Sequence, residues 1–301
     1  MAYGSPSSLD ELGDYLAQVR GGRGSSPDEI EDLKHRYQRV GGQTPLLQIT
    51  KSQGDALEKK LIADGAPARV CFGMKHWHPF VEDVVEKVSN DNPPILVGLA
   101  LAPHYSKLSI GGYEDGVRRG LARKHSNVPF VMVKSWHTEP SLITVLSTRV
   151  SKGLSEMGGS ERTVVVFTAH SLPLRAISDD DPYRAQLLET SRLVARGAGV
   201  PDWDFAFQSA SGPTGTWLGP SLKEKISEFS NKGIKRILVC PVGFVSDHLE
   251  ILYDLDVEAR DCANSHGIKL ARTLSLNDDP KFIEALAAVA RPILVKPVAA
   301  R

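Results

Sequence analysis

Acidic residues recur every four positions in one stretch of this chain, DHLEILYDLDVE, at residues 247–258. On a continuous α-helix, Glu250, Asp254 and Glu258 would lie one above another on a single face, beside His248. Like charges at this spacing destabilise a helix by about 0.2–0.5 kcal/mol per pair. Two interpretations stay open: a solvated acidic helix face, or carboxylates that accept protons and hold a divalent cation.

A histidine at the end of an apolar segment is the second candidate. RTVVVFTAH, residues 162–170, has the composition of a buried strand and ends in His170. Open α/β sheets bind ligands beyond the carboxyl ends of their strands. The acidic row follows another such segment, KRILVCPVGF at 235–244, so we expect His170 and Glu250 to reach the same sheet edge. Taken alone, a histidine at this position is more often a structural one with its hydrogen bonds satisfied, and the acidic row at the same sheet edge is what favours a functional role for His170.

These candidates depend on strands and helices that alternate along the chain. Short apolar segments rich in β-branched residues are separated by amphipathic ones, which indicates an α/β fold with doubly wound parallel sheets covered by helices. The expected strands are 68–74, 95–103, 129–134, 162–170, 203–208 and 235–244. The expected helices include 26–42, 79–89 and 181–200.

The same pattern suggests two similar halves. Segments 95–113 and 236–253 both run from a strand through a proline to a helix. The Gly- and Ser-rich stretch SKGLSEMGGSERT at 151–163 has the composition of a linker. We therefore expect one domain over 1–155 and a second over 156–301, and allow for the last helix packing back on the first domain.

Composition narrows the class of protein. The chain has 301 residues, 41% hydrophobic and 24% charged, with a formal net charge of zero. This is typical of a globular enzyme and gives no electrostatic reason to expect a nucleic-acid partner. The apolar runs are too short to span a bilayer and the N-terminus has no signal-peptide pattern, so we expect a cytoplasmic protein without integral membrane contact. Three scattered cysteines argue against a disulfide framework or a four-cysteine metal site.

Several common α/β motifs are absent from the sequence. It has no G-x-G-x-x-G between a strand and a helix, no G-x-x-x-x-G-K-[ST] and no G-x-S-x-G. Dinucleotide, phosphate-loop and serine-hydrolase chemistries are therefore disfavoured.

Six sequence blocks, in order, resemble the ferrochelatases, most closely the monofunctional bacterial type that acts on coproporphyrin. They are MAYGSP (1–6), GGQTPL (41–46), LAPHYS (101–106), FTAHSLP (167–173), TWLGPSL (216–222) and PVGFVSDHLEILYDLDVE (241–258). The resemblance implies an α/β protein of two similar Rossmann-like domains, each with a parallel four-stranded sheet flanked by helices, and a porphyrin cleft between them. It implies a lyase of haem biosynthesis that inserts Fe2+ into the porphyrin with no organic cofactor.

The resemblance also assigns roles to residues. His170 and Glu250 would be the catalytic pair, which receives Fe2+ and takes up the pyrrole protons. Asp254 and Glu258 would form an outer site for a hydrated divalent ion such as Mg2+. Tyr3 would lie on the opposite porphyrin face, where it can ligate the product iron. The residues implied to line the porphyrin site and engage its propionates are Tyr3, Arg20, Arg36, Tyr37, Thr44 and Tyr113.

Trp217 is a further candidate of the porphyrin site, and for Trp217, Arg20 and Arg36 the residues alone support a second interpretation. Arg20 and Arg36 could belong to solvated helix faces, although a guanidinium suits a propionate carboxylate well. Trp217 could form part of the pocket wall or simply pack in the core.

The expected reaction is conversion of coproporphyrin III to Fe-coproporphyrin III, with porphyrin and Fe2+ as partners and other haem-pathway enzymes as further ones. The alternatives are a protoporphyrin IX ferrochelatase, another tetrapyrrole chelatase such as one for Co2+, and a non-catalytic porphyrin or haem carrier. A carrier has no use for a pair of proton acceptors, so His170 together with Glu250 favours an enzyme.

One departure from the family concerns the N-terminus. Family members usually have an apolar strand directly before the block that reads MAYGSP, whereas Met1 opens that block here. Two explanations stay open: the true start lies upstream, or the sheet tolerates a shortened first strand. A frayed terminus would not hold Tyr3 against the porphyrin.

Overall fold

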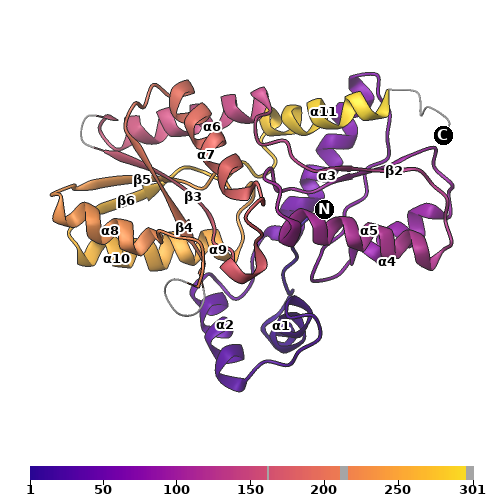
Figure 1. Ribbon diagram of the computed structural model, residues 1–301, viewed down its shortest axis with the longest axis horizontal. Helices are drawn as coiled ribbons and strands as arrows, with labels where there is room; N and C mark the ends of the chain where they lie inside the picture. The colour runs from indigo at the N-terminus through magenta and orange to yellow at the C-terminus, as the bar shows by residue number, and fades with distance from the viewer. Residues whose placement is uncertain (161–162, 211–215, 296–301) are drawn as a thin grey trace. The chain divides into compact units, whose positions relative to one another are not determined.

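A computed structural model describes residues 1–160, 163–210 and 216–295 and divides the chain into two compact units (Figure 1). Unit 1 combines Met1–Trp136 with the chain from Asn277 onward, and unit 2 is His137–Leu276. Parallel sheets flanked by helices confirm the expected α/β class. Within the described ranges, no helix is both long and apolar enough to cross a membrane.

The unit boundaries differ from the expected division at residue 155. Helix α6 (Pro140–Glu156) continues into the segment expected to be a linker, and it packs on α7 (Tyr183–Gly197) and β5 (Arg236–Cys240) of unit 2. Its apolar residues Leu142, Val145, Leu146 and Val150 are buried, so the helix belongs to the unit 2 core. Helix α11 (Pro280–Leu294) packs on α3 (Leu46–Ala63) in unit 1.

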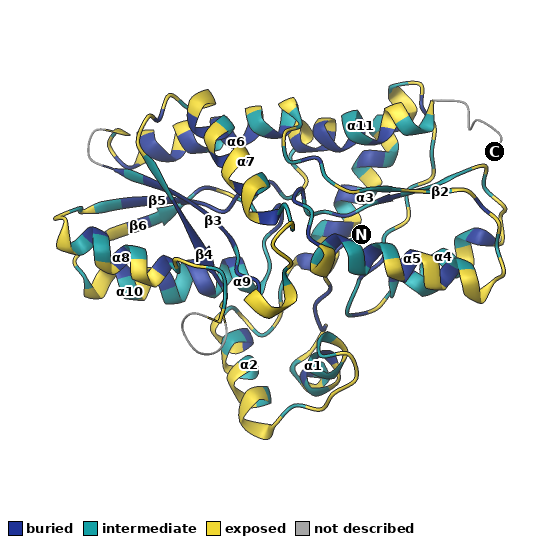
Figure 2. Ribbon diagram, in the orientation of Figure 1, coloured by how far each residue is buried: buried dark blue, intermediate teal, exposed yellow. Residues whose placement is uncertain are grey.

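Unit 2 contains the expected four-stranded parallel sheet, in the order β4-β3-β5-β6. Besides β5, the sheet consists of β3 (Val164–His170), β4 (Trp203–Gln208) and β6 (Lys269–Arg272). In central β3, the five residues between Val164 and His170 are all buried. Helices α6 and α7 lie on one side of the sheet, and α8 (Leu222–Asn231) and α10 (Arg260–Ser265) lie on the other (Figures 1 and 2). Strand β6 was not predicted, because KLAR is too short and too polar to stand out.

The stretch 247–258 does not form the single continuous α-helix that the acidic spacing suggested. It forms α9 (Leu249–Leu252) and then a π-helical segment, Asp254–Ala259, whose wider turn ends the strict stacking of the carboxylates. A parallel row of apolar residues decides which side faces the core: Ile251, Leu255 and Ala259 are buried against the sheet. The π-helical segment is therefore anchored by apolar packing.

Unit 1 has a smaller sheet than expected. Strands β1 (Leu96–Leu99) and β2 (Phe130–Val133) pair in parallel, and α4 (Val81–Ser89) packs on α5 (Gly112–Arg123). The expectation of four strands here is wrong for the described residues, because the segment 68–74 forms only isolated bridges through Met74. A cavity of about 900 Å³ lies beside Met1 and is lined mainly by apolar residues, which come from the segments 65–73 and 93–101 and from α3, α4 and α11.

The N-terminus is held in place by backbone hydrogen bonds and is not frayed. The Met1 ammonium donates to the Leu99 carbonyl at 2.7 Å, and the Leu101 amide donates back to the Met1 carbonyl at 2.8 Å. On the other side, the Lys75 amide donates to the Ala2 carbonyl at 2.9 Å. Burial lowers the pKa of the α-amino group to about 5. Tyr3 therefore follows a segment paired on both edges.

The two units share a local feature that the sequence hinted at. Strand β1 is followed by a π-helical turn, Lys107–Gly111, before α5, and β5 is followed by α9 and the π-helical segment Asp254–Ala259. π-helical turns widen the helix and occur often at functional sites. In unit 2 this turn follows the helix that carries Glu250, and it contains Asp254 and Glu258.

Candidate functional site

His170 occupies the carboxyl end of β3. The Tyr183 hydroxyl donates to its backbone carbonyl at 3.0 Å, which ties the strand end to α7. The ring Nδ1 contacts the Ser171 carbonyl oxygen. A carbonyl can only accept a hydrogen bond, so Nδ1 carries the proton and Nε2 presents its lone pair. Nε2 lies 3.6 Å from the Glu250 carboxylate.

Glu250 reaches this point because of the sheet topology. Strands β3 and β5 are neighbours and parallel, so the chain leaving β5 emerges at the same edge as His170. The Gln208 side-chain amide, at the end of β4, donates to the Glu250 carbonyl at 2.9 Å, and Thr168 of β3 donates to Gln208 at 2.8 Å. Two strand ends thus fix the backbone of the catalytic candidate.

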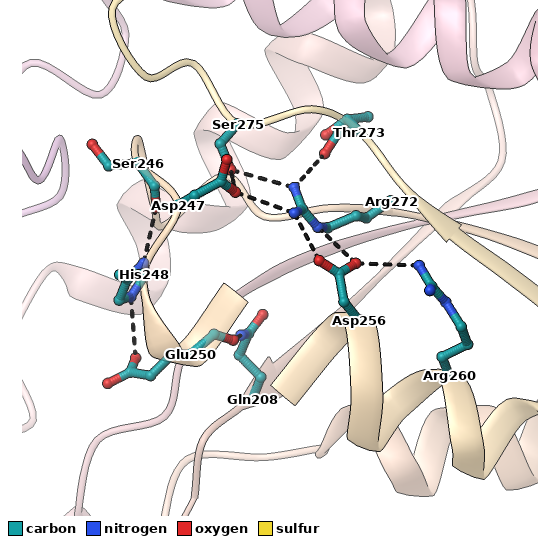
Figure 3. A network of polar contacts seen from close by, with 10 residues as sticks. All are labelled: Gln208, Ser246, Asp247, His248, Glu250, Asp256, Arg260, Arg272, Thr273 and Ser275. Carbon is teal, nitrogen blue, oxygen red and sulfur yellow. Dashed lines mark hydrogen bonds and ion pairs between the residues drawn. The ribbon is translucent and has the colours of Figure 1, made fainter. Parts of the chain in front are cut away.

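A second imidazole lies on the other side of the Glu250 carboxylate. His248 Nε2 is 3.8 Å from Glu250 Oε2, and His248 Nδ1 donates to the Ser246 carbonyl at 2.9 Å (Figure 3). Burial lowers the pKa of His248, but the Glu250 carboxylate, the Ser246 carbonyl and Asp254 outweigh this and raise the pKa above its ordinary value. The sequence placed His248 beside the acidic row, and the structure brings it against Glu250.

The two outer carboxylates have internal partners. Asp254 is buried and accepts a hydrogen bond from the Ser209 hydroxyl. Glu258 is partly exposed and forms an ion pair with Lys223 at 2.9 Å. In the parts of the chain that the structure describes, no group of three or more His, Cys, Asp or Glu side chains is arranged to hold a metal ion. Binding of a hydrated cation by these two acids stays a prediction.

Tyr3 and Tyr113, both expected in the porphyrin site, lie in unit 1 beside a basic pair. The Tyr3 side chain is exposed, and its ring centre lies 4.5 Å from that of His76. Tyr113 is buried, with Lys75 Nζ 5.5 Å from its ring centre. Burial raises the pKa of Tyr113 and lowers the pKa of Lys75 to about 8, despite the opposing influence of Asp115.

The other expected porphyrin contacts of unit 1 are engaged with protein groups. The Ser5 hydroxyl joins Tyr37 at 2.9 Å and Thr44 at 2.8 Å, and Tyr37 is buried. Arg20 makes a two-pronged ion pair with Glu29 at 2.5 and 2.8 Å. In α2 (Pro27–Arg39), Arg36 pairs with Asp32 at 3.1 Å. A propionate would have to compete with these carboxylates for the two arginines.

Trp217 is partly buried in unit 2 and pairs with the loop that follows His170. It forms an antiparallel bridge with Pro173, flanked by hydrogen bonds of 3.0 Å from Leu218 to Leu172 and from Leu174 to Thr216. This pairing gives Trp217 a structural role in shaping the loop, whether or not its ring also contacts a ligand.

Sequence reasoning gave no site role to several residues that the structure places beside candidate residues of their own unit. Gln208 could have been found, because it ends a predicted strand that neighbours β3. In unit 1, Lys75 and His76 lie beside Tyr113 and Tyr3, and both stand in KHWHP, an unusual basic cluster. Arg272 had no usable signal, because its strand was not predicted.

The arrangement of these side chains is suited to proton transfer. A carboxylate flanked by two imidazoles can accept and relay protons. Binding of Fe2+ by His170 and Glu250 stays a prediction. The fixed Nδ1 tautomers keep both Nε2 atoms turned toward Glu250.

Comparison with known proteins agrees with this chemistry. The Ferrochelatase family model matches residues 1–293. A ferrochelatase of Herpetosiphon aurantiacus is 43% identical over 293 residues, covering 96% of this chain and 96% of that protein. A ferrochelatase of Deinococcus radiodurans is 40% identical and covers 96% and 93%. A coproporphyrin III ferrochelatase of Oceanobacillus iheyensis is 38% identical and covers 96% and 94%.

Solved structures share the fold at low sequence identity. SirB from Bacillus subtilis with Fe3+ superposes with a TM-score of 0.58 at 14% identity, over 81% of this chain and 89% of that one. CbiX, titled the terminal enzyme for siroheme biosynthesis in denitrifying bacteria, gives a TM-score of 0.51 at 11% identity, over 97% and 96%.

Proposed function

Because the chain belongs to the ferrochelatase family and is therefore a metal chelatase of haem biosynthesis, we propose that it inserts Fe2+ into coproporphyrin III to give Fe-coproporphyrin III. The observation that supports this site most is the Glu250 carboxylate between two imidazoles, 3.6 Å from His170 and 3.8 Å from His248.

The reaction determines what the protein must supply. Two pyrrole N–H bonds break, the iron binds the four ring nitrogens, and two protons leave, while iron stays in the ferrous state. A site for this reaction needs acceptors for two protons and a transient ligand for the incoming metal.

In our proposal, His170 and Glu250 supply those functions. The His170 Nε2 lone pair can ligate Fe2+ or accept a proton, because Nδ1 is held protonated by the Ser171 carbonyl. Glu250 accepts a proton and passes it toward His248, whose raised pKa suits an acceptor. Gln208 keeps the Glu250 backbone in place during these transfers.

Two lines of support favour coproporphyrin over protoporphyrin. Several of the relatives, at 36–38% identity, are named coproporphyrin III ferrochelatases. The residue at the position of the family's product-ligating tyrosine is Tyr3, which is exposed and follows an anchored terminus.

We further propose that Asp254 and Glu258 bind a hydrated divalent cation such as Mg2+, for which the buried Asp254 would have to give up its hydrogen bond from Ser209. Mg2+ commonly keeps several waters and takes one or two carboxylates. Glu258 would exchange its ion pair with Lys223 for the cation. The haem-pathway partners and the cytoplasmic location stay predictions.

The test is anaerobic Fe2+ insertion followed by porphyrin absorbance, with coproporphyrin III and protoporphyrin IX side by side. His170→Ala and Glu250→Gln are each expected to lower kcat by about 100-fold or more while porphyrin still binds. The matched control is His125→Asn, at an exposed histidine beyond α5. Its kcat should stay within twofold of wild type.

Each outcome has a definite meaning. Faster turnover of coproporphyrin that is lost in both site variants supports substrate and site together. Preference for protoporphyrin overturns the substrate proposal, and preference for Co2+ over Fe2+ overturns the metal. Tight porphyrin binding without turnover in the wild type would make the protein a carrier.

A further inference from the structure

Arg272, on strand β6, is the centre of a polar network beside the site (Figure 3). Its guanidinium grips Asp256 through two bonds, Nε to Oδ1 at 3.0 Å and Nη2 to Oδ2 at 2.8 Å. The same Nη2 lies 3.1 Å from Asp247. The Arg272 side chain is only 12% exposed, so both ion pairs are largely shielded from solvent.

The two carboxylates that Arg272 joins lie on opposite sides of the site residues in the chain. Asp247 immediately precedes His248, and Asp256 lies in the π-helical segment after α9. Between them, the chain carries both His248 and Glu250. Because the planar guanidinium of Arg272 pairs with both Asp247 and Asp256, it fixes the two ends of this segment relative to β6.

Two smaller contacts orient the same network. The Ser275 hydroxyl donates to Asp247 at 2.7 Å, and Arg272 Nη1 donates to the Thr273 carbonyl at 3.3 Å. The guanidinium therefore makes hydrogen bonds through Nε, Nη1 and Nη2, and these bonds fix the orientation of its plane. These contacts suit Arg272 to fixing the positions of Asp247 and Asp256 relative to each other.

We infer that Arg272 is a positioning residue for metal insertion: it holds the segment 247–256 so that His248 and Glu250 keep their mutual geometry. The inference deepens the proposed function and rests on it. A displacement of about 1 Å in a reacting group can lower kcat by about 100-fold without affecting substrate binding.

The test compares Arg272→Lys with Arg260→Gln. Lysine keeps the positive charge but cannot make the two-pronged bond to Asp256 while also reaching Asp247. Arg260 contacts the same Asp256 at 3.3 Å from an exposed position, so its loss is a matched control on the same carboxylate. We expect about 10-fold lower kcat for Arg272→Lys, porphyrin Kd within twofold of wild type, and kcat within twofold for Arg260→Gln.

All rates are taken well below the melting temperature of each variant, so that unfolding does not contribute. If Arg272→Lys does not fold, Asp256→Asn serves in its place, because it keeps the side-chain shape while weakening the same link. It should lower kcat several-fold more than Arg260→Gln, again with Kd unchanged.

A kcat within twofold of wild type for the Arg272 or Asp256 variant would overturn the positioning role. So would a rise in Kd that matches the loss of kcat, since that would indicate general damage. The ratios of variant to wild-type kcat and Kd are measured with whichever porphyrin the wild type converts. Failure of wild type to use coproporphyrin therefore refutes the substrate proposal and leaves this test readable with protoporphyrin.

Discussion

Hydrogen bonds to backbone carbonyls decide what the two site histidines can do. Ser171 and Ser246 each occupy the Nδ1 side of one ring, so each Nε2 is turned to the same carboxylate. The sequence shows the two histidines, but which ring nitrogen carries the proton depends on where the Ser171 and Ser246 carbonyl oxygens lie. Single-residue changes at this site should therefore act on chemistry more than on stability.

The outer acidic pair yields a prediction in two directions. Glu258→Gln should weaken activation by added Mg2+, because a ligand is lost. Lys223→Met should strengthen it, because it frees Glu258 from an ion pair of 2.9 Å. The measurement is initial rate against Mg2+ concentration, with porphyrin Kd as the control. Identical Mg2+ curves for wild type and both variants would refute the outer site.

His76 should make stability fall in mildly acidic solution. Burial, assisted by the charge of Lys75, lowers its pKa from 6.5 to about 4. Between these values the unfolded chain binds more protons than the folded one, so stability is lost as pH falls from 6.5 toward 4. In urea unfolding, wild type should lose about 1–2 kcal/mol more than His76→Asn over this range. Equal losses would contradict the prediction.

Among the elements, the loop that follows β5 must approach β3 very closely. A Cβ added at Gly243 would lie 2.5 Å from Ala169 Cβ and 2.8 Å from Ala169 Cα. The Gly243 amide also donates to Thr168 at 3.1 Å, so the loop cannot easily move away. This contact sets the distance between the chain leading to Glu250 and the strand carrying His170.

Gly243→Ala should therefore destabilise the protein by about 1–3 kcal/mol, through overpacking. It should also lower kcat, because the loop moves away from His170. Gly54→Ala is the control, since its added Cβ would meet Val70 at an ordinary 3.6 Å. Thermal melting and Fe2+ insertion assays test both effects, and an unchanged Gly243→Ala variant would show that the backbone adjusts there without loss.

For the molecule as a whole, the two units differ in how completely their sheets are built. Unit 2 has a four-stranded sheet with a buried central strand, whereas the described part of unit 1 has two paired strands beside a cavity of about 900 Å³. In β1 only Gly98 is fully buried. Lower packing density favours local opening.

Hydrogen exchange should show this difference directly. We expect peptides covering β1 to exchange at least roughly 10-fold faster than peptides covering β3, because β1 packs less completely. Mass spectrometry of the full chain, with a short proteolysis step, is the measurement. Equal protection of the two strands would mean that the cavity does not weaken unit 1.

The sequence by itself determined the α/β class, most strands, and the two residues that meet at the end of β3. Those features follow from local hydrophobic patterns and from the rule that neighbouring parallel strands end at one edge. Only the tertiary structure decided the unit boundaries, the π-helical turn at Asp254, the anchored N-terminus and the network of Arg272. Each of these depends on contacts between segments far apart in the chain, and no local pattern records such contacts.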